Sequence, residues 1–166
     1  MLFGKRNPTP KPVPGDRVDL LIRAQLPSAD DEAVRLVTAI TGLLACVAYA
    51  DRKYEAAEQA HVEAALRRVE GLDSAAVETI CSALRDHIVR IATGNTHAYT
   101  RDLRELVDVE IRREVLDVLV DLAAADGEIV LAESDLLRRT AAAMGLTPDD
   151  YLASQARYRD RLSLLK

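Results

Sequence analysis

The chain repeats a short acidic pattern after each of two alanine-rich apolar segments. The first copy reads A-D-R-K-Y-E-A-A-E and contains Asp51 and Glu58, and the second reads A-D-G-E-I-V-L-A-E and contains Asp126 and Glu133. Asp and Glu are seven residues apart in both copies, and the copies are offset by 75 residues. The repeat predicts a duplicated helix hairpin with two carboxylates at each corner. It also predicts that the fold brings these four acidic groups together.

Composition favours a helical protein. Hydrophobic residues make up 49% of the 166 residues, but aromatic residues only 4%, and Trp is absent. The core must therefore come from Ala, Leu, Val and Ile, and with few glycines this mixture is typical of helices. A chain of this length buries an adequate core as one domain. We predict an all-α, single-domain bundle.

Charge and apolar patterning exclude several classes of protein. The net charge of −5 argues against nucleic-acid binding, because no dominant basic surface exists to displace counterions. The longest apolar run, Gly42 to Ala50, is far shorter than the ~20 residues of a membrane-spanning helix. The N-terminus lacks the apolar segment of a secretory signal. Cys46 and Cys81 lie on apolar helical stretches without C-x-x-C spacing, so we expect buried thiols in a reducing compartment, the cytoplasm.

The chain divides into a basic, proline-rich tail over residues 1–15 and a helical domain over residues 16–166. Apolar periodicity and stop signals predict about seven helices in two pseudo-symmetric hairpin units, and no strand. A short segment opens at Thr100, between the helix that stops at Gly94 and the helix that starts at Asp108. The expected ranges are 16–25, 30–51, 55–69, 74–94, 108–125, 132–144 and a last helix from 147.

Three features fix the details of these helices. One predicted core face comprises Val77, Ile80, Leu84, Ile88 and Ile91, and another comprises Ile111, Val115, Val118, Leu119 and Leu122. Thr147 is the predicted N-cap of the last helix, with Pro148 in its first turn and Asp150 completing a capping box. Gly127 is expected to end its helix with a positive φ.

The acidic corners have two interpretations. In one, each Asp caps the backbone N–H groups of the following helix and the Glu completes that cap. In the other, Asp51, Glu58, Asp126 and Glu133 join backbone carbonyls to bind a divalent cation such as Ca²⁺, Mg²⁺ or Mn²⁺, which takes oxygen ligands. The corner is too short for an EF-hand, whose loop has about twelve residues.

Catalysis is not indicated. Glu58 and His61 form an E-x-x-H pair as in di-iron bundles, but the second copy has Leu136 in place of the His. No phosphate loop, nucleophile elbow or Cys–His pair is present. A carboxylate metalloenzyme stays an alternative that would need further ligands. We expect a non-enzymatic protein.

The repeated residues resemble the TerB family of tellurite-resistance and stress-associated domains, which is also related to the N-terminal part of a membrane-anchored DnaJ-like co-chaperone. The resemblance rests on A-A-A-D-G-E-I at Ala123 to Ile129, its weaker copy at Ala50 to Tyr54, and M-G-L-T-P-D-D-Y at Met144 to Tyr151. It covers most of the chain from Val34 to Tyr158. No His-Pro-Asp occurs, so a J-domain role is excluded.

The resemblance implies an all-α fold, a cation site at positions matching Asp51, Glu58, Asp126 and Glu133, and a role in metal and oxyanion stress. The chain departs from the family pattern at Arg52, where Gly is expected. Because a positive φ is costly for Arg, we expect a different turn at the first corner. Arg52 could also neutralise a neighbouring carboxylate.

These observations lead to one main expectation, a TerB-like stress-response domain that binds a divalent cation, a protein partner of unknown identity, or both. The alternative is a pure protein-interaction module whose acidic corners serve only as helix caps. Neither interpretation fixes the oligomeric state, and a homo-oligomer is compatible with both.

Overall fold

Eight α-helices and no strand make up the part of the chain that the computed structural model describes, residues 17–94, 96–125 and 127–164. The all-α prediction is confirmed. The predicted tail, residues 1–15, lies outside the described residues. The helices are α1 (Val18–Gln25), α2 (Asp31–Ala48), α3 (Ala56–Arg67), α4 (Ser74–Ala92), α5 (Thr96–Leu106), α6 (Val109–Ala123), α7 (Leu131–Ala143) and α8 (Pro148–Leu164).

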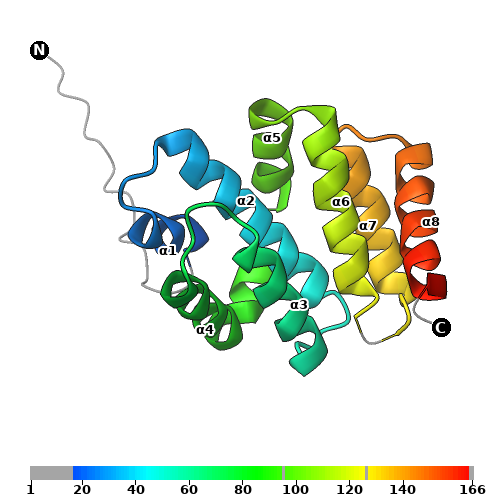
Figure 1. The fold of residues 1–166 in the computed structure, drawn as a ribbon, viewed down its shortest axis with the longest axis horizontal. Coiled ribbons are helices and arrows are strands. Elements are labelled where there is room, and N and C mark those ends of the chain that lie inside the picture. The colour runs from blue at the N-terminus through cyan, green and yellow to red at the C-terminus, as the bar shows by residue number, and fades with distance from the viewer. Residues whose placement is uncertain (1–16, 95, 126, 165–166) are drawn as a thin grey trace, which may run out of the picture.

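Helix α2 is the centre of the bundle. It packs against α1, α3, α4, α5, α6 and α7, and from Thr41 to Ala48 every residue is buried. Figure 1 shows α2 running through the middle of the molecule, with α1, α3 and α4 to one side and α6, α7 and α8 to the other. The apolar run that was too short for a membrane span therefore forms the buried C-terminal half of the central helix. Among the described residues, no helix combines the length and apolar character that crossing a membrane requires.

Helix α5 is the element that the sequence underestimated. A short segment was expected from Thr100, but a helix of 11 residues covers Thr96–Leu106 and packs closely on α2. Thr100 lies in the middle of it, 2% exposed, and its hydroxyl donates to the carbonyls of Thr96 and His97. Threonine often starts a helix, but its hydroxyl can equally bond a carbonyl one turn back inside a helix.

The buried face of α6 is rotated relative to its predicted stripe. Val115, Leu119 and Leu122 of the predicted stripe are buried as expected, but Leu116, Val120 and Ala123 are buried too, and Ile111 in the first turn is 39% exposed. At 100° per residue, Arg112 is the first-turn position aligned with Leu119, which lies near the middle of this buried face. Ile111 and the half-buried Val118 therefore lie at the edge of the face. The core face predicted for α4, by contrast, is confirmed at all five positions.

Side-chain caps define the starts of several helices, and the cap predicted for the last helix is confirmed. The Thr147 amide donates to Asp150 Oδ2 at 2.8 Å, and the Asp150 amide donates to Thr147 Oγ1 at 3.1 Å, so the predicted capping box is complete. Three further helices begin at an aspartate that accepts from an amide three residues later, namely Asp30, Asp73 and Asp108. Both cysteines are free thiols and buried, as expected.

Candidate functional site: the two acidic corners

The two acidic segments form corners between antiparallel helices. The first corner, residues 49–58, joins α2 to α3, and the second corner, residues 124–133, joins α6 to α7. Both corners lie at the lower edge of the molecule in Figure 1. Asp126 lies outside the described residues, so the second corner is described by its other members.

The two corners share a left-handed residue and a turn hydrogen bond at matching positions. Arg52 has a φ of 64° and Gly127 a φ of 105°, at positions 75 residues apart. The Arg52 amide donates to the Tyr49 carbonyl at 2.9 Å, and the Gly127 amide donates to the Ala124 carbonyl at 2.9 Å. The expectation of a different turn at Arg52 is therefore wrong. Arg52 takes the left-handed conformation in spite of its Cβ, and the same turn results. A symmetry relation between whole hairpins in space stays a prediction.

The two glutamates also occupy matching places. Glu58 Oε2 accepts from the Glu55 amide at 3.0 Å, and Glu133 Oε2 accepts from the Val130 amide at 2.9 Å. Each is the third residue of its helix and reaches back to the residue before the helix. Both carboxylates are buried, with Glu58 5% and Glu133 3% exposed. A negative charge is favourable in the first turn of a helix, because of the macrodipole and the unpaired amides there.

Asp51 has a different role from the one expected of a cap. Its Oδ1 accepts from the Lys53 amide at 2.9 Å, and Lys53 precedes α3 by three residues. The carboxylate therefore closes a local turn and leaves the amides of α3 to other groups. Arg52 is exposed and makes no ion pair in the described part of the chain, so it does not neutralise Asp51 or Glu58 there.

The carboxylates described so far do not form one cation centre. No group of three or more His, Cys, Asp or Glu side chains within residues 17–94, 96–125 and 127–164 stands close enough to hold a metal ion. Asp51, Glu58 and Glu133 thus stay apart as a set. His61 is exposed, and its Nδ1 lies 3.1 Å from the Ala57 carbonyl, whereas Glu58 is buried.

Tyr54 of the first corner is half-buried and packs against the apolar core. Burial raises the pKa of its phenol above the ordinary value, and the nearby Cys81 and Glu58 contribute to the shift, so Tyr54 is neutral and can donate a hydrogen bond. Its carbonyl accepts from Gln59 Nε2 at 2.9 Å, which ties the corner to the first turn of α3.

The second corner carries two features that we did not predict. Val130 and Leu131 are 41% and 76% exposed at its tip. Beside them is a hollow of about 370 Å³ lined by Glu128, Ile129, Ser134, Gln155, Tyr158 and Arg159. A position-by-position comparison of the two copies would have revealed the exposed apolar pair Val130 and Leu131. The first corner reads K-Y-E-A where the second reads E-I-V-L, so Glu55 and Ala56 stand at the matching positions.

A family model described as "Tellurite resistance protein TerB" matches residues 37–156, which includes both corners. The chain belongs to the TerB family. The resemblance drawn from the repeated residues is thereby confirmed. No curated protein and no solved structure matched the chain. In this TerB-family protein the matched region contains the whole of the α6–α7 hairpin and the α2–α3 hairpin from residue 37 onward, and α1 lies before it.

Proposed function

We propose that this TerB-family protein is a non-enzymatic, cytoplasmic binding domain associated with tellurite and metal stress, and that each acidic corner binds a divalent cation. The observation that carries the proposal is the burial of Glu58. Its carboxylate is 5% exposed and has no ion-pair partner in the described part of the chain, and one backbone amide donates to it.

A buried carboxylate is costly unless its charge is compensated. The Glu55 amide and the start of α3 compensate part of the charge of Glu58. A hard divalent cation would supply the rest, and the corner offers it oxygen ligands from Glu58, Asp51 and the backbone carbonyls between them. Among the described residues, Asp51, Glu58 and Glu133 do not gather around one point. We therefore propose one ion at each corner, and not one ion shared by the two corners.

The second corner repeats the arrangement with Glu133, which is 3% exposed and bonded to the Val130 amide. Asp126 follows Asp51 by 75 residues in the sequence, the same offset as between the two glutamates. We therefore assign Asp126 the ligand role that we propose for Asp51 in the first corner. Gly127 adopts the positive φ at lower cost than Arg52, so the second corner holds this turn with less backbone strain.

Isothermal titration calorimetry of the full chain with Ca²⁺, Mg²⁺, Mn²⁺ and Zn²⁺ tests the proposal. Glu58→Gln and Glu133→Gln keep the shape of the side chain and an oxygen that accepts from the backbone amide, but they remove the charge. Each should abolish binding at its own corner. Asp73→Asn is the matched control, because it removes one carboxylate at the start of α4 and Asn is an equally good N-cap.

Equal heats for the wild type, both glutamine variants and the control would refute cation binding at the corners. A thermal melt with and without chelator gives an independent measurement, since an ion at 100 times its Kd stabilises the fold by about 2.7 kcal/mol. If the corners are only caps, the chelator leaves the melting temperature unchanged.

A second candidate function, binding a protein partner, is favoured by the exposed tip of the second corner. The first corner builds the same turn with Glu55 and Ala56 where the second has Val130 and Leu131. The fold therefore does not require apolar residues there, and exposed apolar groups of this kind occur at interaction sites. A photo-crosslinking residue at position 131 should capture a partner or a second copy, and one at position 56 should not. Equal capture at both positions would count against this surface.

A further inference from the structure

Helix α8 is attached to the edge of the bundle by polar contacts and by two tyrosines, Tyr151 in the apolar core and Tyr158 packed against it. In Figure 1 it lies beyond α6 and α7, and these are the two helices that it packs against. Of its residues from Pro148 to Asp160, only Tyr151 and Ser154 are buried. Ser154 is 0% exposed and is polar.

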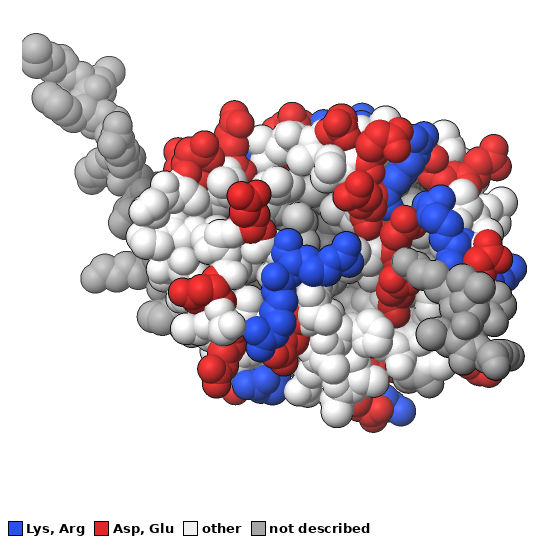
Figure 2. Space-filling model, in the orientation of Figure 1, with Lys and Arg blue, Asp and Glu red and all other residues white. Residues whose placement is uncertain are grey.

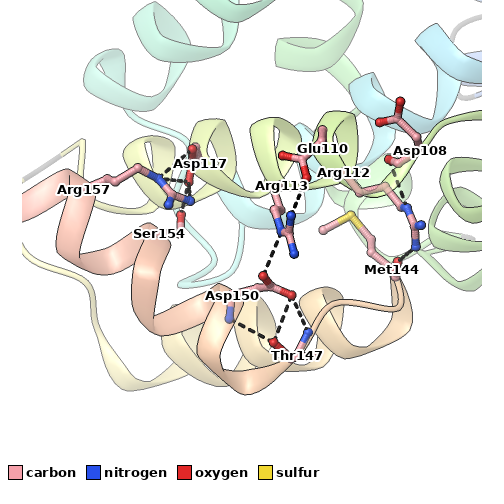
Figure 3. A network of polar contacts seen from close by, with 10 residues as sticks. All are labelled: Asp108, Glu110, Arg112, Arg113, Asp117, Met144, Thr147, Asp150, Ser154 and Arg157. Carbon is pink, nitrogen blue, oxygen red and sulfur yellow. Dashed lines mark hydrogen bonds and ion pairs between the residues drawn. The ribbon is translucent and has the colours of Figure 1, made fainter.

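The middle of α8 is held by Asp117 of α6. Ser154 Oγ donates to Asp117 Oδ1 at 2.6 Å, and Arg157 donates to the same carboxylate through Nη2 at 2.7 Å and through Nε at 3.1 Å. Figure 3 shows both side chains converging on Asp117 from one face of α8. The side chains of Asp117 and Arg157 are 23% and 47% exposed, so salt reaches this ion pair.

The start of α8 is held by Arg113 of α6. Arg113 Nε donates to Asp150 Oδ1 at 2.8 Å, and Arg113 Nη1 donates to Glu110 Oε1 at 2.5 Å (Figure 3). Asp150 is at the same time part of the capping box with Thr147. The guanidinium therefore links the cap of α8 directly to the surface of α6.

Helix α4 shows how differently the corresponding helix of the first hairpin is attached. Both α4 and α8 follow their corner by one helix, and they begin 74 residues apart. Helix α4 buries Ala76, Val77, Ile80, Cys81, Leu84, Ile88 and Ile91. An apolar face of this kind is held by the hydrophobic effect, which salt does not weaken, whereas exposed ion pairs are weak and are screened.

We propose that α8 is a displaceable strap, which separates from α6 and α7 as a unit while the rest of the bundle stays folded, and which ionic strength helps to open. Opening removes Gln155, Tyr158 and Arg159 from the hollow beside the second corner. It also breaks the contact between Tyr158 Oη and the Ala124 carbonyl, 3.4 Å, at the first residue of that corner. Because α8 supplies three of the six lining residues, the hollow exists only while the strap is closed, whether or not a cation occupies the corner.

Hydrogen exchange of the full chain, measured by mass spectrometry at about 0.05 M and about 1 M NaCl, tests the strap. Amides of α8 should exchange before those of α2 at low salt, and high salt should raise their rates by about threefold to thirtyfold. Rates in the buried stretch of α2 from Thr41 to Ala48 should not rise, because the ion pairs of α2 involve Asp31 and Arg35, which lie outside that stretch. Equal protection of α8 and α2 at both salt concentrations would overturn the proposal.

A matched pair of variants locates the effect. Arg157→Gln should speed exchange in α8 at low salt and reduce the further effect of high salt. Arg67→Gln removes an ion pair of similar exposure, with Glu63 on the same helix, and should leave exchange in α8 unchanged. If Arg157→Gln and Arg67→Gln affect α8 equally, the strap is wrong. If Arg157→Gln does not fold, the salt titration of the wild type decides alone.

Discussion

The ring of Tyr99 in α5 occupies the space that a side chain at Gly42 in α2 would need. A Cβ atom added at Gly42 would lie 2.2 Å from Cε2 of Tyr99. Burial raises the pKa of the Tyr99 phenol, with a smaller contribution from the nearby Cys46, in agreement with a ring packed into the bundle. The absence of a side chain at Gly42 therefore lets α5 approach the central helix closely.

We predict that Gly42→Ala lowers the free energy of unfolding by about 1–3 kcal/mol, because overpacking forces the ring or α5 to move. This loss should outweigh the gain of up to ~1 kcal/mol that alanine gives inside a helix. Urea unfolding measures the change. In a Tyr99→Leu background the cost of Gly42→Ala should shrink, and equal costs in both backgrounds would show that the ring is not the cause.

The sequence predicted those parts of the fold that depend on local chemistry. The Thr147–Asp150 cap, the left-handed Gly127 and the apolar face of α4 each follow from residues close together in the chain. The misses depend on contacts between distant segments. Helix α5 has a polar composition and is ordered by packing on α2, and Arg112 takes a place in the first turn of α6 because it donates to the Met144 carbonyl at 2.6 Å.

The candidate site was predictable in position but not in chemistry. The repeat located both corners, and the burial of Glu58 and Glu133 follows from their reach back to a backbone amide. The turn at Arg52 was mispredicted. A residue other than glycine disfavours the left-handed conformation by only about 1–2 kcal/mol, which is small against the free energy gained by packing the two helices that flank the turn.

The positive φ of Arg52 gives a second prediction. Arg52→Gly should raise the free energy of unfolding by roughly 1 kcal/mol, because glycine takes this conformation without a Cβ clash. Gly127→Ala should lower it by roughly 1–2 kcal/mol through backbone strain alone, since no atom within 4 Å would contact the new Cβ. Chemical denaturation measures both. Changes of the same sign would contradict a shared left-handed turn.

The seam between α6 and α8 gives a third prediction. Ser154→Ala should cost about 1.5–3 kcal/mol of stability, because the buried hydroxyl donates to the charged Asp117. Ser134→Ala is the matched control, since the Ser134 hydroxyl lies 3.3 Å from the neutral Tyr151 hydroxyl, and it should cost about 0.5–1 kcal/mol. Thermal unfolding of both variants measures the difference. Equal losses would mean that the charge of Asp117 adds nothing to the hold on α8.

Asp150 gives a prediction about pH. The Thr147 amide, and then Arg113, hold the pKa of the Asp150 carboxyl below its ordinary value of 3.8, against an opposing effect of burial. A depressed pKa in the folded state means that the charged carboxylate stabilises the fold. This contribution to stability is complete at pH values above 3.8, the ordinary pKa that the carboxyl has in the unfolded chain. It is lost as the pH falls through the lower pKa of the folded state. Asp150→Asn should therefore flatten the decline of stability below that pH, measured by urea unfolding from pH 7 to about pH 2.5.

Asp149→Asn is the control, because Asp149 is exposed and makes no hydrogen bond or ion pair within the described residues, and it should leave the decline unchanged. An identical decline in the wild type and both variants would show that the link between Arg113 and Asp150 does not set the acid sensitivity of α8.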